Sequence, residues 1–459
     1  MNAIIFSAIW GVVMMFSGLL KRGQGTSRMM AVIGMALLFI VNLLELDGHR
    51  FVDIDVRGML AFSTYSYLFN AVIFGCTLLY FILSGADLRR SGRDVGEYFA
   101  LMFFIMCGAS IATSFNNMLM LFLSIEIISI PTYILAGIDK RNLKGNEAAL
   151  KYFLMGAFST GIMLMGIALI FGAKASFNLQ VIAAGNETLT PLMSVGILLL
   201  LFSMAFKVSA APFHFWTPDV YDGAPASITS FMATIVKIAA FAAFYRLFRN
   251  TFGSAQDHWF IIAAIITALT LFIGNITAVF QQSVKRMLAY SSIAQAGFML
   301  FAIVSMNQRA DEGILLYALA YSLATIGIFA VLVRLKDYTF DGFNGLAKHH
   351  PVLAATNAVF LLSLAGIPLT AGFMAKFYML TAALQTGKLL WLVIIGIIGA
   401  AISVYYYFRV IQAMYFKDGE AQDIPHSGGL NAMLIVLAGL IVFIGIFPES
   451  VLGFLYYFL

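Results

Sequence analysis

The chain has 459 residues, of which 61% are hydrophobic and only 11% are charged, and its formal net charge is +5. A soluble globular domain carries about 25% charged residues, so this composition excludes one and predicts that lipid covers part of the molecule. The small net charge gives no indication of nucleic-acid binding.

Fourteen apolar runs are long enough to cross a bilayer, which takes about 20 residues per helix. The runs are too long and too uniformly apolar for the strands of a membrane barrel. The sequence therefore predicts an all-α integral membrane protein. The predicted spans are 3–20, 28–45, 63–84, 97–113, 116–137, 148–172, 192–213, 224–246, 259–280, 288–306, 313–333, 351–383 (interrupted), 390–408 and 431–456.

The loops between these spans differ in charge. The odd-numbered loops hold most of the loop Lys and Arg, such as Lys21 and Arg22 in the first, Arg89 in the third and Lys285 in the ninth. The even-numbered loops hold fewer, and Arg246 is counted among them. Because short cytoplasmic loops are enriched in basic residues, we expect both termini to lie on the outer side of the membrane.

A few charged residues lie inside the predicted spans. The lysines are Lys151, Lys207, Lys237 and Lys376, and Glu126 is the one acidic residue deep in a span. A charge at the centre of a spanning helix costs about 2.5–3.5 kcal/mol on insertion scales. Structural ion pairs or side chains that reach the interface are one explanation, above all for Lys151 near its helix start. However, a lysine in apolar surroundings also gives up its proton readily, so the set predicts a proton path.

Prolines lie close to these charges, and a helical proline frees the carbonyl four residues before it. In a membrane such a group needs protein or water nearby, and interrupted helices indicate an ion pathway. We therefore expect helix breaks beside the charges, in the seventh and twelfth spans above all. The pairs are Glu126 and Pro131, Lys207 and Pro212, and Pro368 and Lys376.

A weak internal repeat suggests how the spans are grouped. Glu147-Ala-Ala-Leu-Lys-Tyr resembles Glu312-Gly-Ile-Leu-Leu-Tyr. Together with the broken spans, the match predicts two five-helix repeats, which are inverted because five is odd. The predicted parts are three N-terminal helices at 1–96, repeats at 97–246 and 247–408, and a C-terminal loop and helix at 409–459.

Four further residues have polar side chains in apolar surroundings. Tyr317, Tyr321 and Thr325 follow one another at a spacing of four and so share one helix face. They line a water path in one interpretation and pack in the core in the other. His214 lies near the expected break of the seventh span, where a proton relay and a hydrogen-bonded boundary histidine are equally good interpretations.

Four segments resemble the antiporter-like membrane subunits of respiratory complex I, a family shared with Mrp-type cation/proton antiporters. The second is the most specific and begins Phe-Lys-Val-Ser-Ala-Ala-Pro-Phe-His-Phe-Trp. The resemblance covers nearly the whole chain. The segments are residues 119–135, 206–225, 284–295 and 366–377.

The resemblance implies roles for the charged residues. Glu126 would pair with Lys207 and tune its proton affinity. Lys237 would be the central relay, and Lys376 the second-half residue linked to the outer side. Within the family the chain looks like the N-type subunits, because it ends after the fourteenth helix, carries Lys376 where M-type subunits have a glutamate, and has Lys151.

One position departs from the family pattern. Gln295 stands where many relatives carry a histidine. Because a neutral amide does not titrate, a proton step at this position is in doubt. Water or a neighbouring hydroxyl would have to serve there.

The chain has no glycine-rich dinucleotide loop, iron–sulfur cysteine pattern or metal-ligand spacing. The resemblance therefore implies a translocating subunit of NADH:quinone oxidoreductase in a bacterial inner membrane, without a redox centre. NAD, FMN, iron–sulfur clusters and quinone would belong to partner subunits. These partners would be an M-type antiporter-like subunit, small membrane subunits and a peripheral redox arm. A Mrp-type sodium/proton antiporter subunit and a passive membrane scaffold are the alternatives.

Overall fold

The computed structural model describes residues 1–17, 24–49, 51–52, 54–83, 95–184, 189–419, 422, 424 and 427–458. Within these ranges the chain forms helices and loops, with three isolated bridges and no strand. The all-α prediction is confirmed. Several basic residues used for the orientation prediction lie outside the described residues: Lys21, Arg22, Arg50, Arg89, Arg90 and Arg93.

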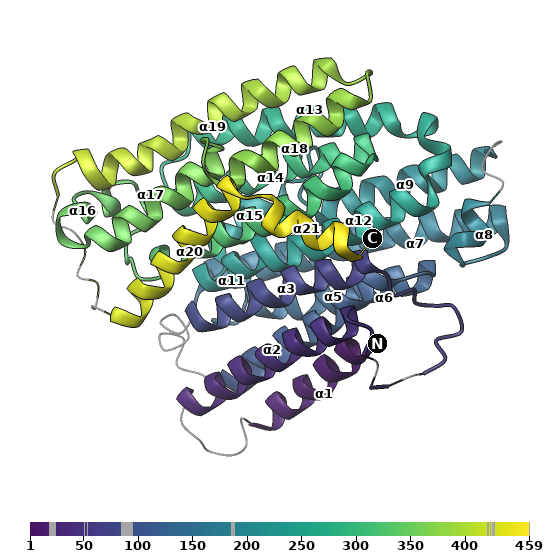
Figure 1. Ribbon diagram of the computed structural model, residues 1–459, viewed down its shortest axis with the longest axis horizontal. Helices are drawn as coiled ribbons and strands as arrows, with labels where there is room; N and C mark the ends of the chain where they lie inside the picture. Colours follow the sequence, from purple (N-terminus) through teal and green to yellow (C-terminus); the bar gives the residue numbers. More distant parts are fainter. Residues whose placement is uncertain are drawn as a thin grey trace. The chain divides into compact units, whose positions relative to one another are not determined.

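The chain divides into two compact units, and the first comprises Met1–Ser209 and Ile235–Ala263. Asparagine and threonine side chains cap many of its helices; for example, Asn117 Oδ1 accepts a hydrogen bond from the Leu119 amide at 2.8 Å. Its helices (Figure 1) are α1 Asn2–Ser17, α2 Gln24–Leu46, α3 Thr64–Leu83, α5 Val95–Ser114, α6 Met118–Ala136, α7 Leu143–Lys174, α8 Leu179–Ala183, α9 Pro191–Lys207, α12 Lys237–Thr251 and the 3₁₀ helix η3 Gly253–His258.

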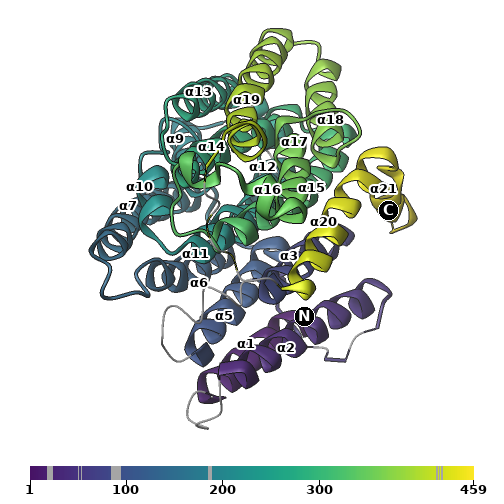
Figure 2. The same ribbon diagram turned by 90° about the vertical axis from the view of Figure 1, so that its left-hand side faces the viewer.

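The second unit comprises Ala210–Thr234 and Ala264–Leu459. The π-helix η2 Met232–Val236 and helix α13 Phe260–Val279 each include a point where the chain passes from one unit to the other. The remaining helices (Figure 2) are α10 Trp216–Gly223, α11 Ala226–Phe231, α14 Val284–Ser305, α15 Gln308–Leu332, η4 Asp341–Phe343, α16 Leu346–His349, α17 Pro351–Ala365, α18 Ala371–Gln385, α19 Leu390–Phe416, α20 Gly428–Ile446 and α21 Glu449–Phe458.

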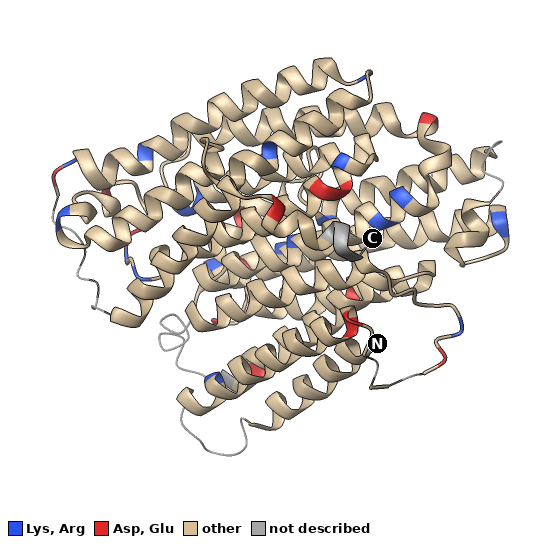
Figure 3. Cartoon of the chain, viewed as in Figure 1, with Lys and Arg blue, Asp and Glu red and all other residues tan. Residues whose placement is uncertain are grey.

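The number of spans agrees with the sequence. Among the described residues, 11 helices are long and apolar enough to cross a membrane, and three shorter apolar helices bring the number to fourteen. Figure 3 shows that most of these helices carry few charged residues along their length. The chain is therefore a multi-pass membrane protein.

The seventh and twelfth spans are broken, as predicted, but the breaks differ in detail. Helix α9 ends at Lys207, before Pro212, and Ser209 has a left-handed φ of +66° that stops the helix. The twelfth span is α17 and α18, separated by a segment that contains Pro368.

Two other details were predicted wrongly. Helix α6 continues through Pro131 without a break, since a helix can tolerate the loss of one backbone donor when its neighbours support it. The last span is two helices, α20 and α21, which separate where Pro448 cannot continue the first.

Two basic residues counted as loop residues are buried. Arg246 lies in α12 with 6% of its surface exposed, and Lys285 lies in α14 with 4% exposed. The Arg246 side chain donates to the Phe115 carbonyl at 2.8 Å, the Ala61 carbonyl at 2.9 Å and the Ser66 hydroxyl at 3.2 Å. It therefore fastens α12 to the junction of α5 and α6.

We predict that Arg246→Ala destabilises the first unit. The change leaves three acceptors without this donor, and the two that belong to buried residues, Phe115 and Ser66, cost about 1–3 kcal/mol each. Thermal unfolding of the purified protein measures this effect. Arg249→Ala removes an exposed arginine from the same helix and is the matched control. Equal unfolding temperatures for the two variants would contradict the anchoring role.

Candidate functional site

Small residues allow α7 and α9 to approach closely in the first unit (Figure 1). A Cβ atom at Gly166 would lie 3.0 Å from the Gly196 carbonyl oxygen, and one at Gly196 would lie 3.1 Å from that of Gly166. Further along the same seam, the Ser203 hydroxyl donates to the Ser159 carbonyl at 2.9 Å. Close approach through small residues and hydroxyls is typical of membrane helices. Here it brings Thr160 of α7 close to Lys207 of α9.

Thr160 connects the ammonium group of Lys207 to the carboxylate of Glu126. The Nζ of Lys207 donates to the Thr160 hydroxyl at 3.4 Å and to the Ser129 hydroxyl at 3.1 Å. The Thr160 hydroxyl in turn donates to Glu126 Oε1 at 2.7 Å. Helices α6, α7 and α9 thus meet in one chain of polar groups. The sequence predicted the Glu126–Lys207 pair, but nothing in it indicated that Thr160 stands between the two groups.

Lys237 is the first residue of α12, directly after the π-helical turn η2. Only 2% of its surface is exposed, within the first unit. Single π-helical turns occur frequently at functional sites. Burial of an ammonium group at this depth is the feature that marks Lys237 as more than a packing residue.

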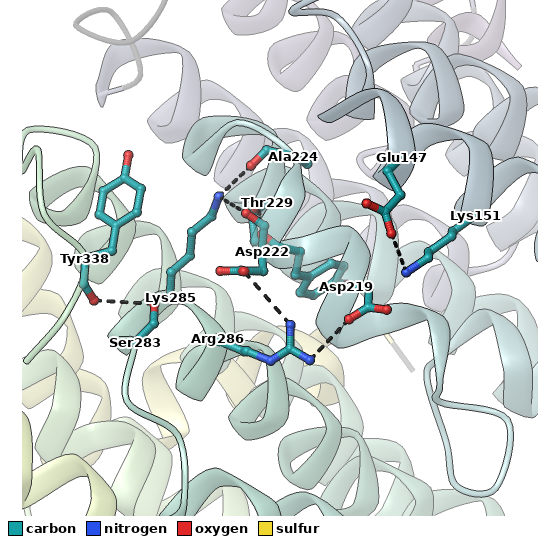
Figure 4. A network of polar contacts seen from close by, with 11 residues as sticks. Glu147, Lys151, Asp219, Asp222, Ala224, Thr229, Ser283, Lys285, Arg286 and Tyr338 are labelled. Atoms are coloured by element: carbon teal, nitrogen blue, oxygen red, sulfur yellow. Dashed lines mark hydrogen bonds and ion pairs between the residues drawn. The ribbon is translucent and has the colours of Figure 1, made fainter. Parts of the chain in front are cut away.

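Lys151 has a different environment. Its Nζ lies 2.8 Å from Oε1 of Glu147, one turn earlier on α7, and 40% of its side chain is exposed (Figure 4). An ion pair of this kind at i, i+4 stabilises a helix by about 0.2–0.5 kcal/mol. Glu147 is therefore an observed partner for Lys151, as the interpretation of Lys151 as part of a structural ion pair requires.

In the second unit, Lys376 binds the end of a broken helix. Helix α17 stops at Ala365 because Gly366 takes a left-handed φ of +83°. The Nζ of Lys376 donates to the carbonyls of Leu364 and Ala365 at 2.8 and 2.9 Å. These carbonyls lack helical partners and carry the negative end of the helix dipole, so they stabilise a buried cation.

Gln295 of α14 lies at the centre of a polar network beside Lys376. Its Nε2 donates to the same Leu364 carbonyl at 2.9 Å and to the Tyr407 hydroxyl at 3.1 Å. Its Oε1 accepts a hydrogen bond from Tyr317. The Tyr407 hydroxyl also contacts the Ser291 hydroxyl. Sequence reasoning missed Tyr407, because it lies among several aromatic residues of α19 with no distinguishing pattern.

A small cavity opens on this network, with a volume of about 10 Å³. Helices α15, α17 and α18, which pack against one another, supply most of its wall. The wall includes Tyr317 and Tyr321, which the sequence placed on one helix face. The lining residues are Gln295, Tyr317, Ala320, Tyr321, Ser363, Leu364, Gly372, Ala375 and Lys376.

His214 lies in the segment between α9 and α10 and is buried. Its ring is stacked near that of Phe215, with 4.7 Å between the centroids, and its Nδ1 has no hydrogen-bond partner among the described residues. The described residues contain no group of three or more His, Cys, Asp and Glu placed to hold a metal ion.

Two basic residues of α14 hold the segment that follows the broken seventh span (Figure 4). The Nζ of Lys285 donates to the carbonyls of Asp222 and Ala224 at 2.8 and 2.5 Å, at the C-terminal end of α10. Arg286 forms an ion pair with Asp219 at 3.1 Å. These residues lie in two of the segments that carried the family resemblance, but no pattern in the sequence assigned a role to them.

The chain is similar to known proteins along its whole length. A family model described as "NADH:quinone oxidoreductase/Mrp antiporter, TM" matches residues 115–403. A protein of Cytophaga hutchinsonii named NADH-quinone oxidoreductase subunit N is 41% identical over 98% of this chain and 99% of that protein.

Two solved structures have similar folds. A chain of respiratory complex I from Thermus thermophilus with bound aureothin has a TM-score of 0.84 and 32% identity, covering 98% of both chains. A chain of the Mrp complex from Dietzia sp. has a TM-score of 0.84 over 99% of this chain and 95% of that one. At 18% identity, the second likeness is one of fold alone.

We predict that Gly366→Ala disturbs Lys376, whereas Gly387→Ala does not. Both glycines have a left-handed φ, so either change strains the backbone and costs about 1 kcal/mol. A Cβ at Gly366 would also lie 2.9 Å from Cδ of Lys376, whereas one at Gly387 meets no atom within 4 Å. Density maps of both variants should show a displaced Lys376 side chain in Gly366→Ala and an unmoved one in Gly387→Ala. An unmoved Lys376 in Gly366→Ala would contradict the prediction.

Proposed function

Because the chain belongs to the NADH:quinone oxidoreductase/Mrp antiporter transmembrane family, we propose that it carries protons across the membrane through Glu126, Lys207, Lys237 and Lys376. The observation that supports the proposal best is the polar chain in which Thr160 joins the Lys207 ammonium to the Glu126 carboxylate. One hydroxyl separates the Glu126 carboxylate from the Lys207 ammonium group. The carboxylate can therefore affect the proton affinity of Lys207 without accepting its proton directly.

The proposed cycle begins with a change in this pair. When Glu126 is close, its negative charge favours the protonated form of Lys207. When a change elsewhere in the complex draws the carboxylate away, the ammonium loses that support and releases its proton. The proton moves through water to Lys237, then to Lys376, and leaves on the outer side. Lys237 and Lys376 each gain and lose one proton, and Lys207 regains its proton from the inner side when Glu126 returns.

Three residues have secondary roles in the proposal. Lys151 would exchange protons with Glu147, to which it is already bound. His214 would hold a proton briefly near the break of the seventh span. Tyr317 would orient the groups around Lys376 through its hydrogen bond to Gln295.

We further propose that the chain acts as subunit N of an NADH:quinone oxidoreductase, as its relative from Cytophaga hutchinsonii is named. It would drive translocation without a redox centre of its own. NAD, FMN, iron–sulfur clusters and quinone would be held by partner subunits, in a peripheral arm and beside an M-type subunit. The chain would lie in the bacterial inner membrane with both termini outside, and its two five-helix parts would be inverted repeats.

The two alternatives differ from this proposal in measurable ways. A Mrp-type antiporter subunit would co-purify with antiporter subunits and would exchange sodium for protons. Identity of 41% to a subunit N, against 18% to the Mrp chain, favours the oxidoreductase. A passive scaffold would tolerate neutral residues at Lys207 and Lys237 without loss of pumping.

We predict that Lys237→Met lowers the number of protons pumped per NADH while the complex still assembles. Methionine has nearly the length of lysine, so α12 keeps its packing but loses the titratable group. Proton uptake by vesicles that contain the purified complex measures the effect. Lys388→Met changes an exposed lysine and should pump like the unmodified complex. Unchanged pumping by Lys237→Met would reject the relay role.

We also predict that Thr160→Val reduces pumping and that Thr160→Ser preserves it. Valine matches the shape of threonine but lacks the hydroxyl, so it removes the connection between Lys207 and Glu126. Hydrogen bonds to charged groups contribute about 1.5–3 kcal/mol each, which is enough to change the balance between protonation states. Proton uptake and NADH oxidation are measured on the same vesicles. If valine and serine gave equal pumping, the hydroxyl would have no part in transfer.

A further inference from the structure

The break between α17 and α18 holds the backbone in an unusual shape. Two residues of the connecting segment, Gly366 and Leu369, have left-handed φ values of +83° and +70°. Glycine adopts this conformation freely, but for another L-residue it costs about 1–2 kcal/mol. Packing of the Leu369 side chain does not offset the cost, because 67% of the residue is exposed. Other contacts must therefore hold the backbone of this segment in place.

Gly445, in the last turn of α20, lies directly against the segment. A Cβ atom at Gly445 would lie 2.5 Å from the carbonyl oxygen of Leu369 and 2.4 Å from the carbonyl carbon of Thr370. Ordinary contacts between carbon atoms are about 3.5–4.0 Å long, so no side chain fits there. Gly445 has no left-handed φ. The position therefore needs glycine for space and not for its conformational freedom.

The same segment begins α18. Thr370 is the N-cap residue of that helix, and its carbonyl accepts a hydrogen bond from the Phe373 amide at 3.1 Å. Two residues after Thr370, the Gly372 amide donates to the Ser363 hydroxyl at 3.1 Å. A Cβ at Gly372 would lie 1.9 Å from the Ser363 carbonyl oxygen. The first turn of α18 is therefore packed against the last turn of α17 with no space between the two backbones.

The contacts of Lys376 depend on where α18 begins. Lys376 lies one turn after Gly372, and its Nζ donates to the carbonyls of Leu364 and Ala365 at 2.8 and 2.9 Å. These carbonyls belong to α17, so the two bonds join one half of the broken span to the other. A shift of about 1 Å along the bonds would take them beyond the usual range for hydrogen bonds.

We propose that Gly445 is a positioning residue for Lys376: the last turn of α20 holds the backbone of Leu369 and Thr370, and so sets the distance from the ammonium group to its two carbonyls. In its effect on transport, the inference rests on the proposed function of Lys376. Helix α20 contains no charged side chain. It therefore acts on Lys376 through packing alone.

Gly445→Ala in the whole complex tests the proposal. The added methyl group needs about 1 Å more room than the break leaves, so it displaces Thr370 and with it Lys376. Displacements of this size in a functional site are costly. We expect the loss of protons pumped per NADH to reach at least half of the loss in Lys376→Ala. Gly439→Ala is the matched control in the same helix, because a Cβ there meets no atom within 4 Å.

A second change separates positioning from a general loss of stability. Glycine at position 369 adopts the left-handed conformation without strain and lets the carbonyl turn away from the methyl group. Adding Leu369→Gly to Gly445→Ala should therefore restore part of the pumping. If Gly445→Ala only weakened the fold, the second change would add to the damage. A double variant that pumps less than Gly445→Ala would overturn the positioning role.

The outcomes distinguish this inference from the proposed function. If Lys376→Ala loses pumping and Gly445→Ala does not, the positioning role is wrong and the function of Lys376 stands. If Lys376→Ala keeps full pumping, the proposed function fails, and a density map of Gly445→Ala decides the positioning role by itself. A displaced Lys376 ammonium group supports that role, and an unmoved one overturns it.

Should Gly445→Ala not assemble, a density map of the unmodified complex decides. Direct contact between the backbones of Gly445 and Leu369 supports the proposal. A gap or a lipid chain between α20 and the break overturns it.

Discussion

The arrangement of this protein depends on how apolar helices accommodate ammonium groups. In hydrocarbon an ammonium needs oxygen atoms nearby, and the two best-described lysines obtain them differently. Lys207 is bound by the hydroxyls of Ser129 and Thr160, with the Glu126 carboxylate behind the second. Lys376 is bound by the carbonyls of Leu364 and Ala365, which a helix break leaves without partners. One lysine therefore responds to a nearby charge, and the other responds to a fixed dipole.

Packing and polarity act together in the first unit. The glycines of α7 and α9 bring the helices so close that the serines and Thr160 can bond across the seam. Bulkier residues at Gly166 or Gly196 would separate the helices and with them the partners of Lys207. The distance between charged groups is thus set by residues that have no charge.

Much of this could be read from the sequence, because the bilayer imposes a length and a polarity on each span. The fourteen spans, the two broken helices and the buried lysines follow from that rule. The burial of Arg246 and Lys285 could not be predicted in this way. A basic residue near the end of a span resembles a loop residue until its backbone acceptors are known. Thr160 and Tyr407 act through partners distant in sequence, which no local pattern identifies. Pro131 shows that a proline alone does not end a membrane helix.

The carbonyl oxygen of Leu364 accepts hydrogen bonds from both Lys376 and Gln295. A charged donor polarises an acceptor more strongly than a neutral amine does, so the strength of the glutamine bond varies with the charge of the lysine. Gln295 is in turn bound to Tyr407 of α19. The charge of Lys376 in α18 therefore affects the hydrogen bonds of Gln295 in α14, and Gln295 links it to Tyr407 in α19.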